Sequence, residues 1–235
     1  RALLDHPGPV HRCGAIALLC RVGPVVTLDA AGLSRQSDWT SWHVTVVGIG
    51  IAGFSAADAL SQLGAQVTVI DAADDDSRRE RAEILDTIGV RVLLGHEGMA
   101  PHDTDLLVVS PGLRPTAPVI VDALDRGIPV WGELELAWRV RHPDTAAAWL
   151  CVTGTNGKTT VTLMLESMLR AAGYRTTAAG NIGTSLVDVV MHDELDVIAV
   201  EVGAPQLPFV HSMSPVAAVC LNIADDHIDL VGSEH

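Results

Sequence analysis

The sequence is short of basic and aromatic residues, and both shortages exclude classes of ligand. It has 15 Lys and Arg against 29 Asp and Glu, which gives a formal net charge of −14 and a pI near 4.9. Nucleic-acid backbones are bound by clustered Lys and Arg, and single strands stack on aromatic rings, which are only 3% of this chain. We therefore expect no nucleic-acid partner. A small phosphorylated ligand remains compatible, because it needs only a local cradle of backbone amides.

Cysteine is also scarce, and no apolar run has the length of a membrane span. The four cysteines form no CxxC pair, so neither a disulfide framework nor a zinc site is predicted, and we interpret them as thiols in a reducing cytosol. A membrane span needs about 18–20 apolar residues, which no run here approaches. The run at 14–20 faintly resembles a signal-peptide core, but Arg21 interrupts it. We expect a soluble, cytoplasmic protein with no membrane insertion.

Length and composition predict one or two globular domains, and the two ends of the chain suggest a fragment. The chain has 235 residues, of which 48% are apolar, enough for a real core. It starts with Arg1 and stops at His235 without a helix end or tail signal. Residues 1–40 contain prolines and no sustained period. We therefore treat them as an N-terminal extension of unknown order.

From residue 41 onward, strand-like and helix-like segments alternate, which is typical of a parallel α/β sheet. A first group of strands is predicted at 43–47, 66–70, 90–94, 105–109 and 128–131. The helices predicted between them span 53–63, 77–88 and 117–126. Pro143 and small residues at 141–147 indicate a boundary. We therefore predict a doubly wound, Rossmann-like domain over 41–143.

A second α/β unit is predicted over 144–235. Its expected strands are 148–152, 174–178, 195–200 and 216–221. A helix is predicted at 159–172, with a buried stripe formed by Leu163, Met164, Met168 and Leu169. A glycine-bearing loop lies between the first strand and this helix. The unit therefore has the layout of a phosphate-loop domain.

The first chemical motif is Gly48-Ile49-Gly50-Ile51-Ala52-Gly53, a GxGxxG between a predicted strand and a predicted helix. The first glycine permits a tight turn, the second lets amides approach a diphosphate, and the third lets helix and strand pack closely. Asp71 ends the next strand, where an acid would hold a ribose hydroxyl. The motif predicts a diphosphate at a helix start. It leaves open NAD, another nucleotide or sugar nucleotide, and purely structural glycines.

The second motif, Thr153-Gly154-Thr155-Asn156-Gly157-Lys158-Thr159-Thr160, is more specific. A strand leads into a glycine-rich turn, and Lys-Thr opens a helix, so backbone amides point at phosphate oxygens. Lys158 would neutralise the β- and γ-phosphates of ATP or GTP, and Thr159 would ligate Mg²⁺. Val152 stands where the longer form of this loop has its first glycine.

The two motifs together favour one class of enzyme. A dehydrogenase has no use for a phosphate loop, and a simple ATPase has no use for the first domain. The pair indicates an enzyme that uses ATP on a substrate that itself carries a nucleotide.

The loop TGTNGKTT at 153–160 is characteristic of the Mur ligase family, and further blocks match it in order. These blocks are GIGIAG at 48–53, SPG at 110–112, WGELEL at 131–136, GNIG at 180–183 and LNIADDHID at 221–229. Over about residues 38–235 the chain resembles the member of this family that adds D-glutamate to UDP-N-acetylmuramoyl-L-alanine in peptidoglycan synthesis. The resemblance implies three domains, which bind the UDP substrate, ATP with Mg²⁺, and the amino acid. It also implies an acyl phosphate that the D-glutamate amine attacks.

The resemblance implies roles for individual residues. The residues implied to contact the UDP substrate are Gly48, Gly50, Ile51, Ala52, Gly53, Asp71, Ser110, Gly112 and Asn181. The ATP site would comprise Gly154, Thr155, Asn156, Gly157, Lys158, Thr159 and Thr160. The implied metal ligands are Thr159, Glu201 and His227. Of these residues, Lys158, Glu201 and His227 are expected to be catalytic. From the residues alone, Glu201 could equally be a solvated acid at a strand end, and Asn181 a turn residue.

The chain departs from the family pattern in two places. Where the family has Glu-Leu-Ser-Ser-Phe-Gln-Leu, residues 201–207 read Glu-Val-Gly-Ala-Pro-Gln-Leu, without the two hydroxyls and the aromatic ring. The family also continues beyond residue 235, with the rest of the ATP domain, a CO₂-modified lysine and an amino-acid-binding domain. We therefore expect the ATP domain to be incomplete, with ligand binding but no turnover, and with a sheet edge and apolar surface left uncovered.

Three alternatives remain open from the sequence. One is another ligase of the family, such as the L-alanine-adding member. The second is a non-catalytic nucleotide-binding paralogue, degenerate or split, which the altered 202–205 segment favours. The third is an NAD-dependent oxidoreductase, which the phosphate loop disfavours. The oligomeric state is left undetermined.

Overall fold

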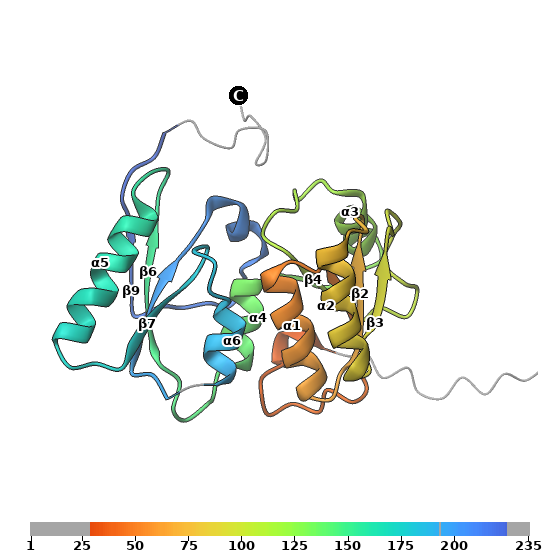
Figure 1. The fold of residues 1–235 in the computed structure, drawn as a ribbon, viewed down its shortest axis with the longest axis horizontal. Coiled ribbons are helices and arrows are strands. Elements are labelled where there is room, and N and C mark those ends of the chain that lie inside the picture. The colour runs from red at the N-terminus through yellow and green to blue at the C-terminus, as the bar shows by residue number, and fades with distance from the viewer. Residues whose placement is uncertain (1–28, 193, 225–235) are drawn as a thin grey trace, which may run out of the picture.

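The computed structural model describes residues 29–192 and 194–224, and its first sheet has five parallel strands in the order β3-β2-β1-β4-β5 (Figure 1). The strands are β1 (His43–Val47), β2 (Gln66–Asp71), β3 (Arg91–Leu94), β4 (Leu106–Val109) and β5 (Val130–Gly132). On the central strand, Val46 is in register with Val69 of β2 and Val108 of β4. The strands are β-branched runs because helices bury both faces of the sheet.

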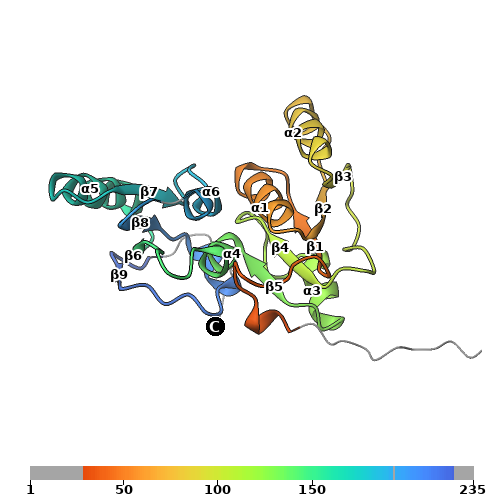
Figure 2. The same ribbon diagram turned by 90° about the horizontal axis from the view of Figure 1, so that it is seen from below.

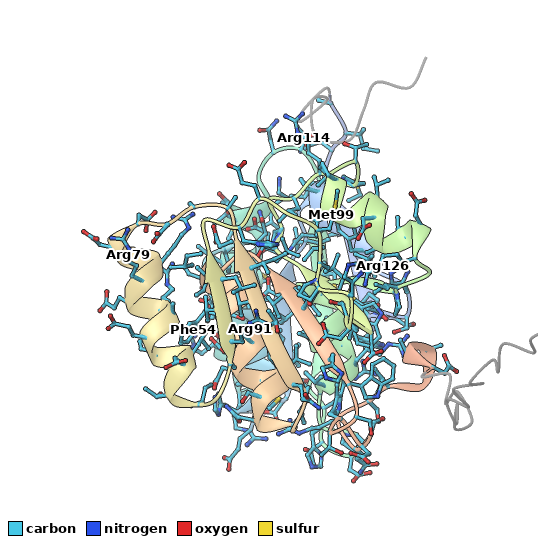
Figure 3. All side chains as sticks on the ribbon, turned by 90° about the vertical axis from the view of Figure 1, so that its right-hand side faces the viewer. Phe54, Arg79, Arg91, Met99, Arg114 and Arg126 are labelled. Carbon is cyan, nitrogen blue, oxygen red and sulfur yellow. The ribbon has the colours of Figure 1, made fainter. Side chains whose placement is uncertain are left out.

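Helices α1 (Ile51–Gln62) and α2 (Asp76–Thr87) cover one face of this sheet, and α3 (Pro118–Asp125) covers the other (Figure 2). Successive strand residues point to opposite faces, so Val46 packs with the residues of α1 whereas Val47 packs with those of α3. Figure 3 views the β3 edge, where Arg91 is exposed. A charged residue on an open edge discourages pairing with another strand.

The second sheet is also parallel, with four strands in the order β7-β8-β6-β9. The strands are β6 (Ala148–Thr153), β7 (Thr176–Gly180), β8 (Val197–Glu201) and β9 (Ala217–Cys220). Helix α5 (Lys158–Ala171) packs against β7 and β8, and α6 (Leu186–Met191) lies toward the first sheet (Figure 1). Strand β9 is the last strand of this sheet in the described residues, and all four of its residues are exposed.

The predicted fold class is confirmed, and every predicted strand is present within two residues of its expected bounds. Besides the short 3-10 turn at 30–32, three elements were not predicted: α4 (Glu133–Val140), α6 and the 3-10 helix η2 (Ala204–Phe209). Helix α4 begins directly after β5 with no intervening loop, so the sequence shows no break there. Helix α6 and η2 each span only six residues, too short for a helical period to be recognised.

The predicted buried stripe of α5 is wrong. Leu163, Met164 and Met168 are 46%, 58% and 66% exposed, whereas Thr162 is fully buried. Apolar residues occur around much of this helix, so its hydrophobic pattern did not identify the face that packs on β7 and β8. The tertiary contact selects the face that carries Thr162, and the methionines remain at the surface.

Part of the predicted extension 1–40 contributes to the core, contrary to its interpretation as an appendage. A 3-10 turn, η1 (Ala30–Gly32), leads into a segment in which Leu33, Trp39 and Trp42 are buried. The Arg35 guanidinium donates hydrogen bonds to the carbonyls of Val190 and Met191 at 3.1 Å each, at the end of α6. The segment therefore ties the second unit to the first.

One continuous apolar core connects the two sheets. Helices α1, α4 and α6 lie side by side between them (Figure 1), and their buried residues belong to one cluster with Val46 of β1 and Val200 of β8. Among the helices of residues 29–192 and 194–224, none is long and apolar enough to cross a membrane.

Candidate functional site

The glycine loop after β1 is shaped by two glycines that the packing requires and one that it does not. Gly48 has φ +92°, and a Cβ there would lie 2.7 Å from the Ser110 Oγ. A Cβ on Gly53 would lie 1.8 Å from the Gly48 carbonyl oxygen. Gly50 is the N-cap of α1, and a Cβ there would meet nothing within 4 Å. The space beside Gly50 is therefore open to a ligand at the positive end of α1.

Asp71 holds the glycine loop in place. Its Oδ2 accepts a hydrogen bond from the Ile49 amide at 2.8 Å. Its Oδ1 accepts hydrogen bonds from the Ala73 amide at 2.9 Å and the Arg78 Nε at 3.1 Å. Both oxygens of this nearly buried carboxylate are thus bound by the protein. Asp71 therefore fixes the backbone of the glycine loop.

Ser110 and Gly112 follow the neighbouring strand β4. The Ser110 amide donates to the Val47 carbonyl at 3.1 Å, and its hydroxyl donates to the Gly48 carbonyl at 3.3 Å. The chain leaves β1 and β4 in opposite directions across the sheet, so a crevice opens at their carboxyl ends. Open α/β sheets bind ligands at such a switch point. The structure thus places Ser110 beside the loop at 48–53, whereas Gly112 lines the cavity at the phosphate loop.

The phosphate loop follows β6 and runs into α5. Gly157 is the N-cap of α5 with φ +85°, and Gly154 has φ +138°. A Cβ on Gly154 would lie 3.1 Å from the Asn222 carbonyl oxygen, so this position requires glycine. Thr159 and Thr160 are exposed in the first turn of α5. The loop residues 154–160 therefore surround a helix N-terminus, which is suited to bind phosphate.

Lys158 lies across the inside of this loop. Its Nζ donates hydrogen bonds to the carbonyls of Gly154 at 2.8 Å and Thr155 at 2.9 Å. The ammonium group is half-buried and sits next to the open end of α5. A positive charge at this point complements a phosphate held by the loop amides.

Asn222 braces the phosphate loop, and the sequence analysis gave it no role. Its carbonyl accepts from the Thr155 amide at 3.0 Å, and its Oδ1 accepts from the Asn156 amide at 2.9 Å. Its Nδ2 donates to the Asn156 carbonyl at 3.0 Å. The only available signal was its place in the matched block at 221–229, since these contacts join residues 66 apart in the chain.

Glu201 and Asn181 meet at the carboxyl ends of β8 and β7. Glu201 is only 1% exposed, and its Oε1 accepts a hydrogen bond from the Asn181 Nδ2 at 3.0 Å. The Asn181 amide also donates to the Glu201 carbonyl at 3.0 Å. The Glu201 Oε2 is buried and has no hydrogen-bond partner among the described residues. Glu201 is thus not a solvated strand-end acid, and Asn181 is not only a turn residue.

The donor atoms of this region fit Mg²⁺. An unpaired buried carboxylate oxygen is costly, and a cation at the Glu201 Oε2 would compensate it. Mg²⁺ prefers oxygen ligands and takes one or two carboxylates together with substrate phosphates. Within residues 29–192 and 194–224, no three His, Cys, Asp or Glu side chains form a cluster. The third predicted ligand, His227, lies outside the described residues.

A cavity of about 480 Å³ joins these parts. Its lining comes from the phosphate loop (Gly154, Thr155, Lys158), from Asn181, and from Pro111 and Gly112 of the first unit. A second pocket of about 190 Å³ lies between Ile51 and Ala52 of the glycine loop and residues 180–185. Pro111 and Asn181 line both spaces, so the two adjoin. One extended ligand can therefore reach from the glycine loop to the phosphate loop.

The altered segment 203–205 forms a wall of the larger cavity. The Gly203 amide donates to the Gln206 Oε1 at 2.8 Å, and the Gln206 Nε2 is buried without a partner. A Cβ on Gly203 would lie 3.2 Å from the Asn181 Oδ1, which is tighter than ordinary contact. The small residue at 203 thus leaves space for the Asn181 side chain, and residues 204 and 205 face the cavity.

The described residues form two parallel-sheet units, each with a glycine loop at a helix start, and the two loops open onto adjoining pockets. The model of the Mur ligase middle domain matches residues 152–235, and that of the MurD-like N-terminal domain of Mur ligases matches residues 42–132. The chain belongs to the Mur ligase family. This confirms the family predicted from the sequence motifs.

Its relatives include enzymes named UDP-N-acetylmuramoylalanine--D-glutamate ligase. That of Streptomyces avermitilis is 48% identical over 199 residues, which cover 84% of this chain and 42% of the relative. That of Frankia casuarinae is 47% identical over 211 residues, which cover 89% of this chain and 44% of the relative. The chain thus spans less than half the length of these relatives. A solved UDP-N-acetylmuramate:L-alanyl-gamma-D-glutamyl-meso-diaminopimelate ligase from Neisseria meningitides is 22% identical with a TM-score of 0.48, over 82% of this chain and 64% of that one.

Proposed function

We propose that this chain carries the UDP-substrate site and the ATP site of an ATP-dependent ligase that joins D-glutamate to UDP-N-acetylmuramoyl-L-alanine. In this proposal residues 41–143 bind the UDP substrate and residues 144–235 bind ATP. The observation that carries it is the cavity of about 480 Å³, in which the phosphate loop, Asn181 and Gly112 meet. The names of relatives at 48% and 47% identity support the choice of D-glutamate.

The UDP substrate is proposed to bind at the carboxyl edge of the first sheet. Its diphosphate would lie beside Gly50, against the amides of Ile51 and Ala52, where a Cβ would meet no protein atom. Ser110 and Gly112 would contact the nucleotide from β4, and Asp71 would border the ribose while it holds the loop. The muramoyl end would extend through the smaller pocket toward Asn181.

ATP is proposed to bind at the loop 154–160, with its phosphates on the α5 N-terminus and against the Lys158 ammonium. Thr159, Glu201 and His227 would hold Mg²⁺; Glu201 is hydrogen-bonded to Asn181, which lines the cavity. The metal ion would neutralise phosphate charge and orient the γ-phosphate. Lys158 would release the Gly154 and Thr155 carbonyls when it turns toward the phosphates.

The chemistry that this arrangement serves is activation of a carboxylate. A carboxylate is a poor electrophile until one oxygen becomes part of a phosphate leaving group. In the proposed reaction the substrate carboxylate attacks the γ-phosphorus, and ADP leaves. The D-glutamate amine then attacks the acyl carbon, and phosphate leaves. Lys158 would stabilise the transferring phosphoryl group, and Asn181 would orient the carboxylate.

A second candidate is a nucleotide-binding paralogue without catalysis. The observation that favours it is the cavity wall at Gly203, Ala204 and Pro205, which carries no hydroxyl or aromatic side chain. Such a protein would bind both nucleotides and transfer nothing. The two candidates therefore differ in turnover and not in binding.

Calorimetry on the purified chain tests the proposal. We would titrate UDP-N-acetylmuramoyl-L-alanine, then ATP with Mg²⁺, then NAD⁺, and repeat the titrations with Gly50→Val. The substituted side chain would enter the ligand space without meeting the protein, so we expect loss of UDP-substrate binding with ATP binding retained. Binding of NAD⁺ without the UDP substrate would overturn the proposal. The chain alone is expected to bind without turnover. Phosphate release and product mass with D-glutamate, measured on a full-length protein that contains this chain, would then separate a ligase from a non-catalytic paralogue.

A further inference from the structure

A buried carboxylate of the first unit accepts hydrogen bonds from the start of a helix in the second unit. Glu133 begins α4 and is 4% exposed. Its Oε1 accepts hydrogen bonds from the Ser185 hydroxyl at 3.0 Å and from the Leu186 amide at 2.9 Å. The donors stand 52 and 53 residues away in the sequence. Both hydrogen bonds cross the boundary between the two sheets.

A third hydrogen bond between the units involves the same helix. The Ser55 hydroxyl of α1, two residues after the glycine loop, donates to the Asp188 Oδ2 of α6 at 2.7 Å. Ser55 is buried, and so are Leu186 and Val187 of α6. Helix α6 is thus held against the first unit by apolar packing and by polar contacts from two different helices.

These contacts lie beside the smaller pocket, through which the substrate is proposed to extend. Ser185 closes the loop that starts at Gly180, where the Gly180 amide donates to the Thr184 carbonyl at 3.0 Å. Asn181 lies in this loop, next to Gly180, and its backbone amide and side-chain amide both donate hydrogen bonds to Glu201. The pocket of about 190 Å³ is lined by Glu133 and Ser185 as well as by Ala52 and Asn181. Glu133 therefore lies between the two surfaces that an extended ligand would touch.

We propose that Glu133 is a positioning residue that sets the spacing between the glycine loop and the Asn181 loop, so that one UDP-muramoyl substrate reaches both. The inference rests on the proposed function. Glu133 acts on the Asn181 loop through its hydrogen bonds with Ser185 and Leu186. Because a buried acceptor with two donors is costly to remove, the spacing is held tightly.

The proposal predicts a difference between ligands that touch one unit and a ligand that spans both. UDP touches only the first unit, and ATP with Mg²⁺ touches mainly the second. In Glu133→Ala we expect the affinity for UDP-N-acetylmuramoyl-L-alanine to fall about tenfold, with UDP and ATP affinities changed less than about twofold. Glu133→Gln keeps an acceptor oxygen for Ser185 and Leu186, so it should restore most of the affinity for the spanning substrate.

Two further variants distinguish a positioning role of Glu133 from a general loss of contacts between α6 and the first unit. Ser55→Ala removes the other contact near the pocket and should weaken the spanning substrate selectively, although less than Glu133→Ala. Arg35→Met removes the contacts with Val190 and Met191 at the far end of α6, away from the pocket, and should leave all three affinities nearly unchanged. If Glu133→Ala does not fold, Ser55→Ala and Glu133→Gln still measure the effect.

The outcomes distinguish this inference from the function it rests on. Equal losses for UDP and for the spanning substrate in Glu133→Ala, or the same loss in Arg35→Met, would overturn the positioning role and leave the proposed function standing. A wild-type chain that binds UDP and ATP but not the muramoyl substrate would overturn both. Selective loss with rescue by Glu133→Gln would support the inference.

Discussion

The side-chain amide of Asn181 donates a 3.0 Å hydrogen bond to one oxygen of Glu201, and the other oxygen of that carboxylate is buried without a partner in residues 29–192 and 194–224. The two residues lie at the ends of neighbouring parallel strands, β7 and β8. A carboxylate that is oriented in this way and left half-satisfied has a free lone pair for a cation.

The first prediction concerns this carboxylate. Glu201→Gln should weaken binding of ATP in the presence of Mg²⁺ by about tenfold or more, because a neutral amide is a poorer Mg²⁺ ligand. The fold should be retained, since an amide is less costly to bury than an unpaired charge. Calorimetry with and without Mg²⁺, together with thermal unfolding, checks both parts. An unchanged Mg²⁺ dependence would remove Glu201 from the metal site.

The second prediction separates structural from ligand-facing glycines in the loop 48–53. Gly53→Ala should lower the free energy of unfolding by about 2 kcal/mol or more, because its Cβ would lie 1.8 Å from the Gly48 carbonyl oxygen. The matched control Gly50→Ala should change it by less than about 1 kcal/mol, since nothing lies within 4 Å. Denaturant unfolding measures both variants. Equal destabilisation would contradict the geometry of the loop.

The third prediction is a pH dependence that originates in Glu135. Burial alone would raise the pKa of this carboxyl, but hydrogen bonds from the side chain and amide of Ser212, the His211 amide and Arg139 outweigh it and lower the pKa to about 2 from an ordinary value of 4.5. The group therefore stabilises the fold fully above about pH 4.5. This stability, about 3 kcal/mol, should be lost as the pH falls toward 2.

Comparison with Glu135→Gln tests this assignment. The substituted side chain does not titrate, so the difference in unfolding free energy between the two proteins should shrink as the pH falls from 5 to 2, about the window that the lowered pKa sets. Glu133 should not add to this loss, because burial raises its pKa, and protonation then favours the folded state. A constant difference between the two proteins would show that Glu135 is not the group that titrates.

The fourth prediction follows from the exposed face of α5. Met168→Lys and Met164→Ser should change the unfolding free energy by less than about 0.5 kcal/mol, because both methionines are more than half exposed. Leu186→Ala, at a fully buried position of α6, should cost about 2–5 kcal/mol in the same assay. A large loss from Met168→Lys would instead favour the buried stripe that the sequence pattern indicated.

Much of the fold and part of the site could be predicted from the sequence, because the signals are local. Strand residues such as Val44–Val47 are a short β-branched run, and the glycines at 48, 50 and 53 have fixed spacing to the helix that follows. The phosphate loop at 153–160 likewise carries its geometry within eight residues. Local propensity and spacing therefore sufficed to predict two parallel-sheet units, each with a phosphate-binding turn.

The tertiary structure alone decided which residues complete the site. Asn222 braces a loop 66 residues away, and Glu133 holds Ser185 across 52 residues. It also decided which side of α5 is buried, and it placed Trp39 in the core. Sequence periodicity describes one element and its immediate neighbours. Hydrogen bonds and packing between distant elements depend on how the two sheets meet, and that arrangement positions the glycine loop, Asn181 and the phosphate loop around one cavity.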